Sequence, residues 1–247
     1  MIDNDAAYPR SEPGQTPLLR MTGIDKTFPG VKALDDVHIT VFHGECLALL
    51  GENGAGKSTL LELLPRFRQP TNGHIVIDGQ DIAGVSLESL RSKIGFVTQD
   101  TPLFDGTITE NVTYGVCGDA SEEQIQQAAR LAGVDELVAS LPEGWETKVR
   151  EGRRMLSSGQ RQRVVLARAL AADPSIIVLD EVGSVLDIES QRTLSEQLRV
   201  LAKHKTVIFA THSMPAMLMA DRVYRMEGGR IVEEDRGEAV LTRLEGT

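Results

Sequence analysis

The hydrophobic pattern predicts mostly extended segments in the first part of the chain. In ALDDVHITVF (33–42) apolar and polar positions alternate, which predicts a half-buried strand with Val37, Ile39 and Val41 on one face. CLALL (46–50) is apolar throughout, as expected of a strand that is covered on both faces of a parallel sheet. Three further segments follow: STLLELL (58–64) predicts a helix, and HIVIDG (74–79) and IGFV (94–97) predict strands.

The middle of the chain, from about Thr107 to Val165, has a helical pattern instead. SEEQIQQAARLAG is the clearest case, because Ser121 is suited to an N-cap and Gly133 to a C-cap. Later segments alternate in type: IIVLD (176–180) and TVIFA (206–210) predict strands, and SQRTLSEQLRVLA (190–202) between them predicts a helix.

The last predicted element is a β-hairpin, formed by RVYRM and GRIVEE around Gly228 and Gly229. Together the elements predict an α/β fold in which a mainly parallel sheet is interrupted by a helical insertion. Residues 1–17 contain several prolines and little apolar material, so we expect a disordered leader or a linker there.

Composition and charge narrow the range of functions. The chain has 247 residues, enough for one large α/β domain or for a core with a subdomain. Its net charge is −10, from 36 acidic and 26 basic residues. Because proteins that grip nucleic acid usually present a basic face, this balance argues against nucleic acid as the main partner.

The two cysteines and the hydropathy carry less information. Cys46 and Cys117 lie far apart and form no CxxC pair, so the sequence predicts neither a zinc site nor a disulfide framework, and it favours a reducing compartment. No run approaches the roughly 18 apolar residues of a membrane-spanning helix, and the polar N-terminus is unlike a signal peptide. A role at a membrane therefore requires a partner.

A phosphate-binding loop follows the apolar strand at 46–50. GENGAGKST matches the pattern G-x-x-x-x-G-K-[ST], and the strand before it and the helix after it make the match specific. Glycines let successive N–H groups converge on phosphate oxygens, Lys57 neutralises the β- and γ-phosphates, and Ser58 is suited to ligate Mg²⁺. The residues expected to bind nucleotide here are Gly51, Asn53, Gly54, Ala55, Gly56, Lys57, Ser58 and Thr59.

Two acidic residues lie at the end of the predicted strand 176–180. Because parallel sheets place ligands at the carboxyl ends of their strands, Asp180 is expected near the phosphates, where it holds Mg²⁺ through water. Glu181 is the better candidate to orient or deprotonate an attacking water. Many buried strands end in aspartate, so this pattern gains its weight only from the phosphate loop.

A second candidate anion site is MLSSGQRQRVVLARAL (155–170), where hydroxyls, a glycine and an amide precede an apolar helical face. A helix N-terminus of this kind suits an anion. The stretch resembles the signature LSGGQ of ABC (ATP-binding cassette) ATPases, and it reads LSSGQ here, from Leu156 to Gln160. From about Leu18 to the end, the chain follows the motif order of that family: phosphate loop, Gln99 in VTQD, signature, Asp180-Glu181, SVLD (184–187) and His212 in FATHS.

The resemblance implies a fold and an assembly. It implies a P-loop NTPase (RecA-like) core at 18–98 and 166–247 with an N-terminal antiparallel β element, and a helical signature subdomain at 99–165. It also implies a head-to-tail dimer that clamps each ATP between the phosphate loop of one domain and the signature of the other. The expected anion at Ser157, Ser158, Gly159 and Gln160 is therefore the γ-phosphate of the ATP that the partner binds.

Single residues also receive roles from the resemblance. Phe28 matches the aromatic residue that stacks on adenine, although the family more often has tyrosine there, and an ordinary core phenylalanine is the alternative. His212 is expected to contact the γ-phosphate, and Asp187 to lie at the dimer interface. The implied catalytic residues are Lys57, Glu181 and His212, and the implied Mg²⁺ ligands are Ser58, Gln99 and Asp180.

Two positions depart from the family pattern. Ser158 replaces the second glycine of the signature, and its side chain either crowds the phosphate or adds a hydroxyl donor. VGSVLD stands where the family more often has ATSALD, which bears on coupling across the dimer. Neither change removes a catalytic group.

Other segments distinguish branches of the family. DTPLFDGTITENVTYG (100–115) and the run with Glu151 before the signature are similar to exporter segments that contact a membrane domain. The apolar residues Leu103, Phe104 and Ile108 favour such a docking surface. TFPGVKALDDV and GENGAGKST look more like importer ATPases of the sugar type. We expect an ATP-hydrolysing subunit or domain of a transporter, with export favoured over import.

The expected partners are a second ABC cassette, identical or related, and a transmembrane domain in the same or a separate chain. Through that domain the chain would lie at the cytoplasmic face of a membrane. A non-transport ABC ATPase acting on nucleic acid or ribosomes is the rival, but the acidic charge, the short helical insert and the single cassette argue against it. A regulatory cassette that hydrolyses ATP poorly is a third reading, and Glu181 and His212 argue against that one.

Overall fold

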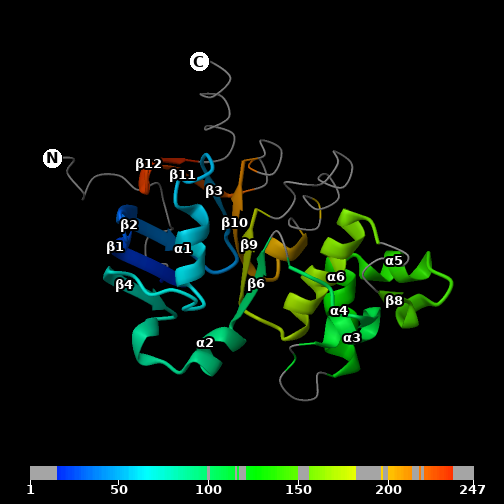
Figure 1. Ribbon diagram of the computed structural model, residues 1–247. Coiled ribbons are helices and arrows are strands. Elements are labelled where there is room, and N and C mark those ends of the chain that lie inside the picture. The colour runs from blue at the N-terminus through cyan, green and yellow to red at the C-terminus, as the bar shows by residue number, and fades with distance from the viewer. Residues whose placement is uncertain are drawn as a thin grey trace.

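A large, mainly parallel sheet forms the centre of the fold in the computed structural model (Figure 1). The residues that the structure describes are 16–98, 101–114, 116, 121–149, 156–181, 196, 200–212, 217 and 220–235. The strand order of the large sheet is β12-β11-β3-β10-β9-β6. Its strands are β3 (Cys46–Leu50), β6 (Ile94–Thr98), β9 (Ile176–Asp180), β10 (Thr206–Thr211), β11 (Arg222–Glu227) and β12 (Arg230–Asp235).

All neighbouring pairs in this sheet run parallel except β11 and β12. These two strands form the antiparallel hairpin predicted around Gly228 and Gly229. The predicted strands at 46–50, 94–97, 176–180 and 206–210 are all present, within a residue or two at their ends.

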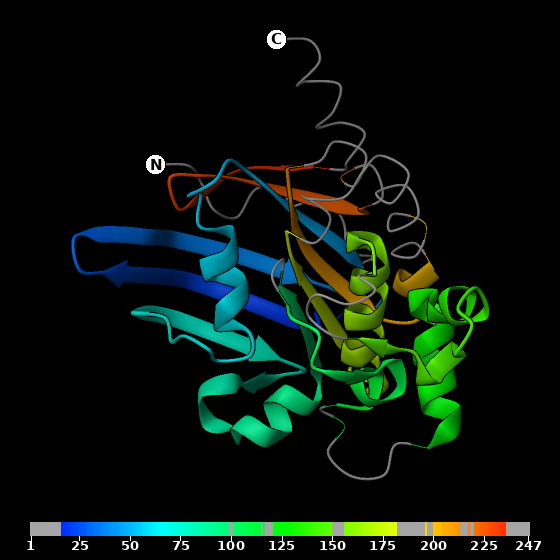
Figure 2. The ribbon, with the colours of Figure 1, turned by 45° about the vertical axis from the view of Figure 1, so that its right-hand side comes forward.

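A second, antiparallel sheet has the strand order β2-β1-β4-β5. Its strands are β1 (Leu19–Phe28), β2 (Val31–Val41), β4 (Asn72–Ile77) and β5 (Gln80–Asp81). In β2, Val37, Ile39 and Val41 are buried and their neighbours are more exposed, so the strand is half-buried as its alternating pattern predicts. Figure 2 shows this sheet to one side of the large one, with α1 (Lys57–Leu63) close to both.

The large sheet is covered on both faces, which explains the continuous apolar run in β3. Cys46, Ala48 and Leu50 belong to one buried cluster, whereas Leu47 and Leu49 belong to another. Strands β9 and β10 divide their side chains between the two clusters in the same alternating way. One cluster includes residues of α1 and the antiparallel sheet, and the other includes the helices of the middle segment.

The middle segment is helical, as predicted, apart from one short sheet. Its elements are α3 (Ile108–Thr113), α4 (Glu122–Ala132), α5 (Val134–Ala139), the 3-10 helix η2 (Gly144–Glu146) and α6 (Ser158–Ala171). Ser121 and Gly133 cap α4 as expected. The short sheet pairs β7 (Gly106–Thr107) with β8 (Lys148–Val149), and strands of two residues are too short to give a hydrophobic period.

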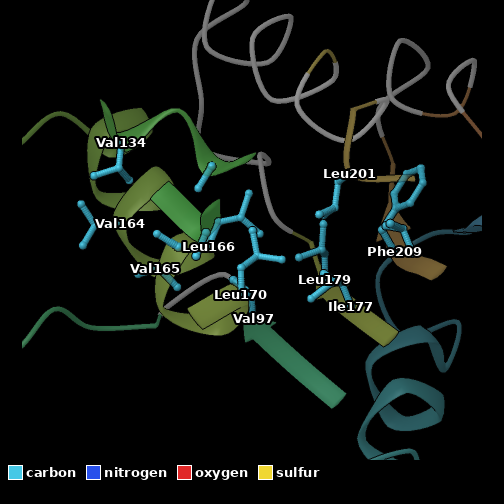
Figure 3. Close-up of a cluster of buried hydrophobic side chains, with 14 of the residues drawn as sticks. Val97, Val134, Val164, Val165, Leu166, Leu170, Ile177, Leu179, Leu201 and Phe209 are labelled. Carbon is cyan, nitrogen blue, oxygen red and sulfur yellow. The ribbon is translucent and has the colours of Figure 1, made fainter. Parts of the chain in front are cut away.

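Helix α6 carries most of the contact between the helical segment and the large sheet. Val164, Val165, Leu166 and Leu170 lie in the same cluster as Ile177 and Leu179 of β9 and Phe209 of β10 (Figure 3). The helix runs without a break through positions 165 and 166, where the sequence analysis divides the core from the signature subdomain. That division remains a proposal.

The remaining elements are α2 (Leu87–Ser92) and the 3-10 helix η1 (Ile82–Gly84). Of the helix predicted at 190–202, residues 196 and 200–202 are described and are helical, and of the predicted leader only residues 16 and 17 are described. Among the described residues, none of the helices combines the length and the apolarity that crossing a bilayer requires.

Candidate functional site

The phosphate loop connects the buried strand β3 to helix α1. Gly56 is the N-cap residue of α1 and has a φ of 101°, in the left-handed region that favours glycine. A side chain there is also excluded by space, because a Cβ atom would lie 2.7 Å from the carbonyl oxygen of Ala33. Within the loop, the N–H of Ala55 donates a hydrogen bond to the carbonyl oxygen of Glu52 at 3.1 Å. Asn53 and Gly54 at the tip are exposed, and Thr59 on α1 is half-buried.

Lys57 is buried, with 3% of its surface exposed. Its Nζ donates hydrogen bonds to the carbonyl oxygens of Gly51 at 2.7 Å and Glu52 at 3.1 Å. It also forms an ion pair with Oε1 of Glu181 at 3.4 Å. A buried ammonium group needs such partners, and here all of them are oxygens at the rim of the loop. The cation is thereby held where phosphate oxygens would meet it.

Ser58 and Asp180 meet although they are far apart in the sequence. Ser58 Oγ donates a hydrogen bond to Asp180 Oδ1 at 2.9 Å. Burial raises the pKa of Asp180, and the nearby Glu181 and Glu62 carboxylates raise it further, while the hydrogen bond from Ser58 and the charge of Lys57 oppose the shift.

This pair fits a magnesium ion in its chemistry. A hydroxyl and a carboxylate are the hard oxygen donors that Mg²⁺ prefers, and a half-buried carboxylate crowded by other acids gains from a nearby cation. The described residues contain no cluster of three or more acidic, histidine or cysteine side chains that could hold a metal alone. Mg²⁺ usually binds proteins through one or two carboxylates together with phosphates, so a pair of this kind is sufficient.

Glu181 directly follows β9 and has a φ of 53°. A residue other than glycine in this left-handed region is uncommon, and such backbone conformations concentrate at functional sites. The turn directs the carboxylate toward Lys57, since their ion pair is observed. The sequence analysis did not predict this ion pair.

Strand register places His212 at the same edge of the sheet. Thr211 of β10 pairs with Leu50 of β3, and Ala210 pairs with Asp180 of β9. His212, the residue directly after β10, is therefore near the start of the loop at Gly51, and it is exposed. The carboxyl ends of three neighbouring strands thus carry Gly51, Asp180 and His212.

Phe28 ends β1 and is half-buried. Two cations lie against its ring: Lys26 Nζ at 5.2 Å and Arg68 Cζ at 5.1 Å from the ring centroid. Arg68 is in turn paired with Glu62. Local sequence does not predict these cations, because nothing in it relates Arg68 to Phe28, which lies in another part of the chain.

The signature residues begin helix α6. Ser157 is the N-cap: its Oγ accepts a hydrogen bond from the N–H of Gln160 at 3.2 Å, and the Gln160 side chain accepts one from the N–H of Ser157 at 2.9 Å. This reciprocal capping box fixes the start of the helix. Ser157 is exposed, whereas Ser158, Gly159 and Gln160 are half-buried.

The signature is separated from the phosphate loop by the large sheet. The apolar side chains of α6 pack on one face of that sheet, and those of α1 pack on the other. Three residues with expected roles, Gln99, Glu151 and Asp187, lie outside the described residues. The roles of all these residues remain predictions.

A glycine loop between a buried parallel strand and a helix, with a lysine, a serine and an aspartate converging at its mouth, defines a P-loop nucleotide-binding domain. A sequence model of the ABC transporter family matches residues 34–184. The chain belongs to the ABC transporter family and carries the ATP-binding domain of that family.

The similar proteins include an ATP-binding protein, an ATP-binding cassette protein and a flippase. It is 43% identical over 208 residues to the heterocyst differentiation ATP-binding protein HepA of Nostoc sp., covering 84% of this chain and 34% of that protein. It is 44% identical over 214 residues to ATP-binding cassette sub-family B member 6 of Rattus norvegicus, covering 87% of this chain and 26% of the relative. To the ATP-dependent lipid A-core flippase of Syntrophus aciditrophicus it is 39% identical over 243 residues, covering 98% of this chain and 40% of the flippase.

A solved structure is also similar to this chain. The structure of a bacterial Atm1-family ABC exporter with ATP bound superposes with a TM-score of 0.82 at 34% sequence identity, covering 93% of this chain and 40% of that one. This chain therefore spans well under half the length of each of these proteins.

Proposed function

We propose that this chain binds ATP with Mg²⁺, hydrolyses it between two head-to-tail cassettes, and drives export through a transmembrane domain. The observation that carries the proposal is the convergence of Lys57, Ser58, Asp180 and Glu181 at the mouth of one phosphate loop. The ATP-binding part of this proposal also has the support of family membership.

Binding begins at Lys57, whose Nζ exchanges its loop carbonyls and the Glu181 carboxylate for phosphate oxygens. Ser58 and Asp180 would hold Mg²⁺, which would neutralise charge on the β- and γ-phosphates. Phe28 offers an aromatic face for the adenine ring.

Hydrolysis requires a base for the attacking water, and Glu181 supplies it. Release of Glu181 from Lys57 frees its carboxylate to accept a hydrogen bond from that water and then its proton. His212, at the end of β10, contacts the γ-phosphate and stabilises the developing charge together with Lys57.

The position of the signature supports a dimer. A helix start that lies across the sheet from its own phosphate loop is better placed for a nucleotide held by a second molecule. We infer that Ser157, Ser158 and the N-terminus of α6 contact the γ-phosphate of the ATP on the partner cassette.

The relatives support export. Two of the similar proteins are named as a flippase and an exporter, and both are much longer than this chain. Of the three apolar residues expected on a docking surface, Phe104 is exposed and Leu103 is half-buried, whereas Ile108 is fully buried and belongs to the core. The exposed rings of Phe104 and Tyr114, with centroids 4.0 Å apart, form a surface on which a membrane domain can dock. Coupling to such a domain places the chain at the cytoplasmic face of a membrane.

The test compares nucleotide binding by Lys57→Ala with that by a matched variant, Lys203→Ala, whose lysine is exposed. Isothermal titration of the chain with Mg-ATP should show binding by the parent and by Lys203→Ala, and a loss of at least about tenfold in affinity for Lys57→Ala. Equal affinity in all three proteins would refute the proposed site.

A further inference from the structure

The turn between β11 and β12 lies against the phosphate loop, although the two are far apart in the sequence. The N–H of Gly229 donates a hydrogen bond to the carbonyl oxygen of Ala55, inside the loop, at 3.1 Å. On its other side, the carbonyl oxygen of Gly229 accepts a hydrogen bond from the N–H of Asp35 at 2.9 Å. The peptide groups on both sides of Gly229 thus connect strand β2 to the phosphate loop.

Close packing at this junction admits only glycine at position 229. Gly229 has a φ of 81°, and a Cβ atom on it would lie 2.6 Å from the carbonyl oxygen of Ala33 and 3.2 Å from Cα of Leu34. These contacts are with backbone, which cannot swing aside as a flexible side chain can. Gly56 of the loop meets the same Ala33 oxygen, and its own Cβ would lie 3.5 Å from Cα of Gly229.

A second close contact lies between β11 and the start of the phosphate loop. A Cβ atom on Gly51 would lie 2.6 Å from the carbonyl oxygen of Met226, the residue before the last of β11. The C-terminal hairpin therefore touches the loop at both of its ends, at Gly51 and at Ala55–Gly56.

The hydrogen bond to Ala55 has a direct consequence for phosphate binding. A trans peptide group is planar, and its C=O and N–H point in opposite directions. Because the carbonyl of Ala55 is fixed toward Gly229, the N–H of Gly56 points in the opposite direction. This N–H is the last one before α1. In a phosphate loop the successive N–H groups must converge on the anion, so their direction determines affinity.

We propose that Gly229 is a positioning residue for the phosphate loop: its N–H holds the Ala55 carbonyl and thereby aims the Gly56 N–H at the phosphates of the nucleotide. The inference rests on the proposed binding of ATP to this loop. It gives the C-terminal hairpin a part in nucleotide binding, beyond its place at the edge of the sheet.

Gly228 provides a matched control in the same turn. Its φ is 53°, so Gly228→Ala introduces a side chain into the left-handed region as Gly229→Ala does, but no atom lies within 4 Å of its Cβ position. Gly229→Ala should lower the affinity for Mg-ATP and Mg-ADP by at least about tenfold, because both carry the phosphates that the loop holds. Gly228→Ala should change neither affinity by more than about twofold.

Circular dichroism and thermal unfolding without nucleotide separate positioning from folding. At a temperature where both variants are folded, a purely structural role of Gly229 would leave the two affinities alike, and that result would overturn the proposal. If the parent chain itself binds no ATP, the proposed function fails. If the parent binds and Gly229→Ala binds equally well, only the role of Gly229 fails.

A measurement on the parent chain does not depend on the variant folding. Mg-ADP should slow hydrogen exchange of the Gly229 amide, observed by NMR, because a loop fixed by phosphate opens its bond to Gly229 less often. The amide of Gly79, in the turn between β4 and β5, should be unaffected. Unchanged exchange at Gly229 with saturating Mg-ADP would contradict the proposal.

Discussion

At the residue scale, the burial and the hydrogen-bond partners of Lys57 suit its proposed role in binding phosphate. Its ammonium group is buried, and its three oxygen partners all belong to the loop or to the end of the neighbouring strand β9. The partner with a full negative charge, Glu181, is also the candidate base, so binding and the release of the base are linked.

Glu181→Gln tests this residue-scale link. The amide can still contact Lys57 and keep the turn, but it cannot take a proton, so we expect hydrolysis to slow by about a hundredfold or more while ATP affinity is retained. Single-turnover hydrolysis and equilibrium binding measure the two effects separately. Glu143→Gln, at an exposed acidic residue, is the control, and parent-like turnover in Glu181→Gln would reject the base.

Asp25 predicts a pH dependence of stability. Hydrogen bonds from the N–H of Asp36 and from the side chains of Lys32 and Asn72 lower the pKa of Asp25 from 3.8 to about 2. A lowered pKa in the folded state means that the contribution is present above pH 3.8 and is lost as pH falls through about 2.

Asp25→Asn should therefore be less stable than the parent at neutral pH, and the difference should shrink as pH falls from 3.8 to about 2. Urea midpoints measured across this range test the expectation. A difference that stays constant with pH would show that the charge of Asp25 is not responsible.

At the scale of elements, α6 joins the signature to the rest of the helical segment. Arg168, near its C-terminal end, donates hydrogen bonds to the carbonyl oxygens of Asn111 at 2.9 Å and Pro102 at 3.0 Å, and to Asn111 Oδ1 at 2.7 Å. Its guanidinium group also lies over the Phe104 ring, 4.6 Å from the centroid. The Arg168 side chain thus connects α6 to the segment that contains the exposed Phe104 and Tyr114.

Arg168→Ala should destabilise the chain by about 2 kcal/mol, because charged hydrogen bonds to a half-buried backbone are lost. Arg168→Lys should recover only part of this, since a lysine cannot reproduce the planar fork. Denaturant unfolding measures both, with the exposed Arg161→Ala on the same helix as control. A loss no greater than that of the control would show that the interactions contribute little.

At the scale of the whole molecule, the two anion-binding ends lie across the large sheet from each other. Helix α1 packs on one face and α6 on the other, so a site that needs both requires a second molecule. In the proposed dimer, ATP would favour the closed form because it would make contacts there that neither cassette makes alone.

The rate of hydrolysis per molecule should therefore rise with protein concentration before it reaches a plateau. Ser157→Arg should still bind ATP on its own loop but support no turnover, since its bulk and charge disrupt the start of α6 that faces the partner. Mixtures of Ser157→Arg with Lys57→Ala should regain activity at one composite site. Concentration-independent turnover by a monomer would contradict the shared site.

Much of the fold follows from local pattern. The apolar run of β3, the alternation of β2, the caps of α4 and the C-terminal hairpin all have short-range causes that operate within a few residues. The sheet formed by β7 and β8 was missed, because two-residue strands bury too little to leave a period. The phosphate loop can be recognised for a similar local reason, because its glycines and lysine have a fixed spacing within one short loop.

The sequence by itself determined the kinds of elements, the phosphate loop and the family, because each depends on residues close together in the chain or on a fixed order of short motifs. The resemblance already implied that Ser58 and Asp180 lie together as ligands of one Mg²⁺, and their hydrogen bond agrees with this. Only the tertiary structure decided that Lys57 meets Glu181, Phe28 meets Arg68 and Gly229 meets Ala55. Strand order and register set the pair of Lys57 and Glu181, since parallel strands bring their carboxyl ends to one edge whatever their separation in the sequence. The other two pairs depend on how the antiparallel sheet and the C-terminal hairpin pack against the rest of the fold.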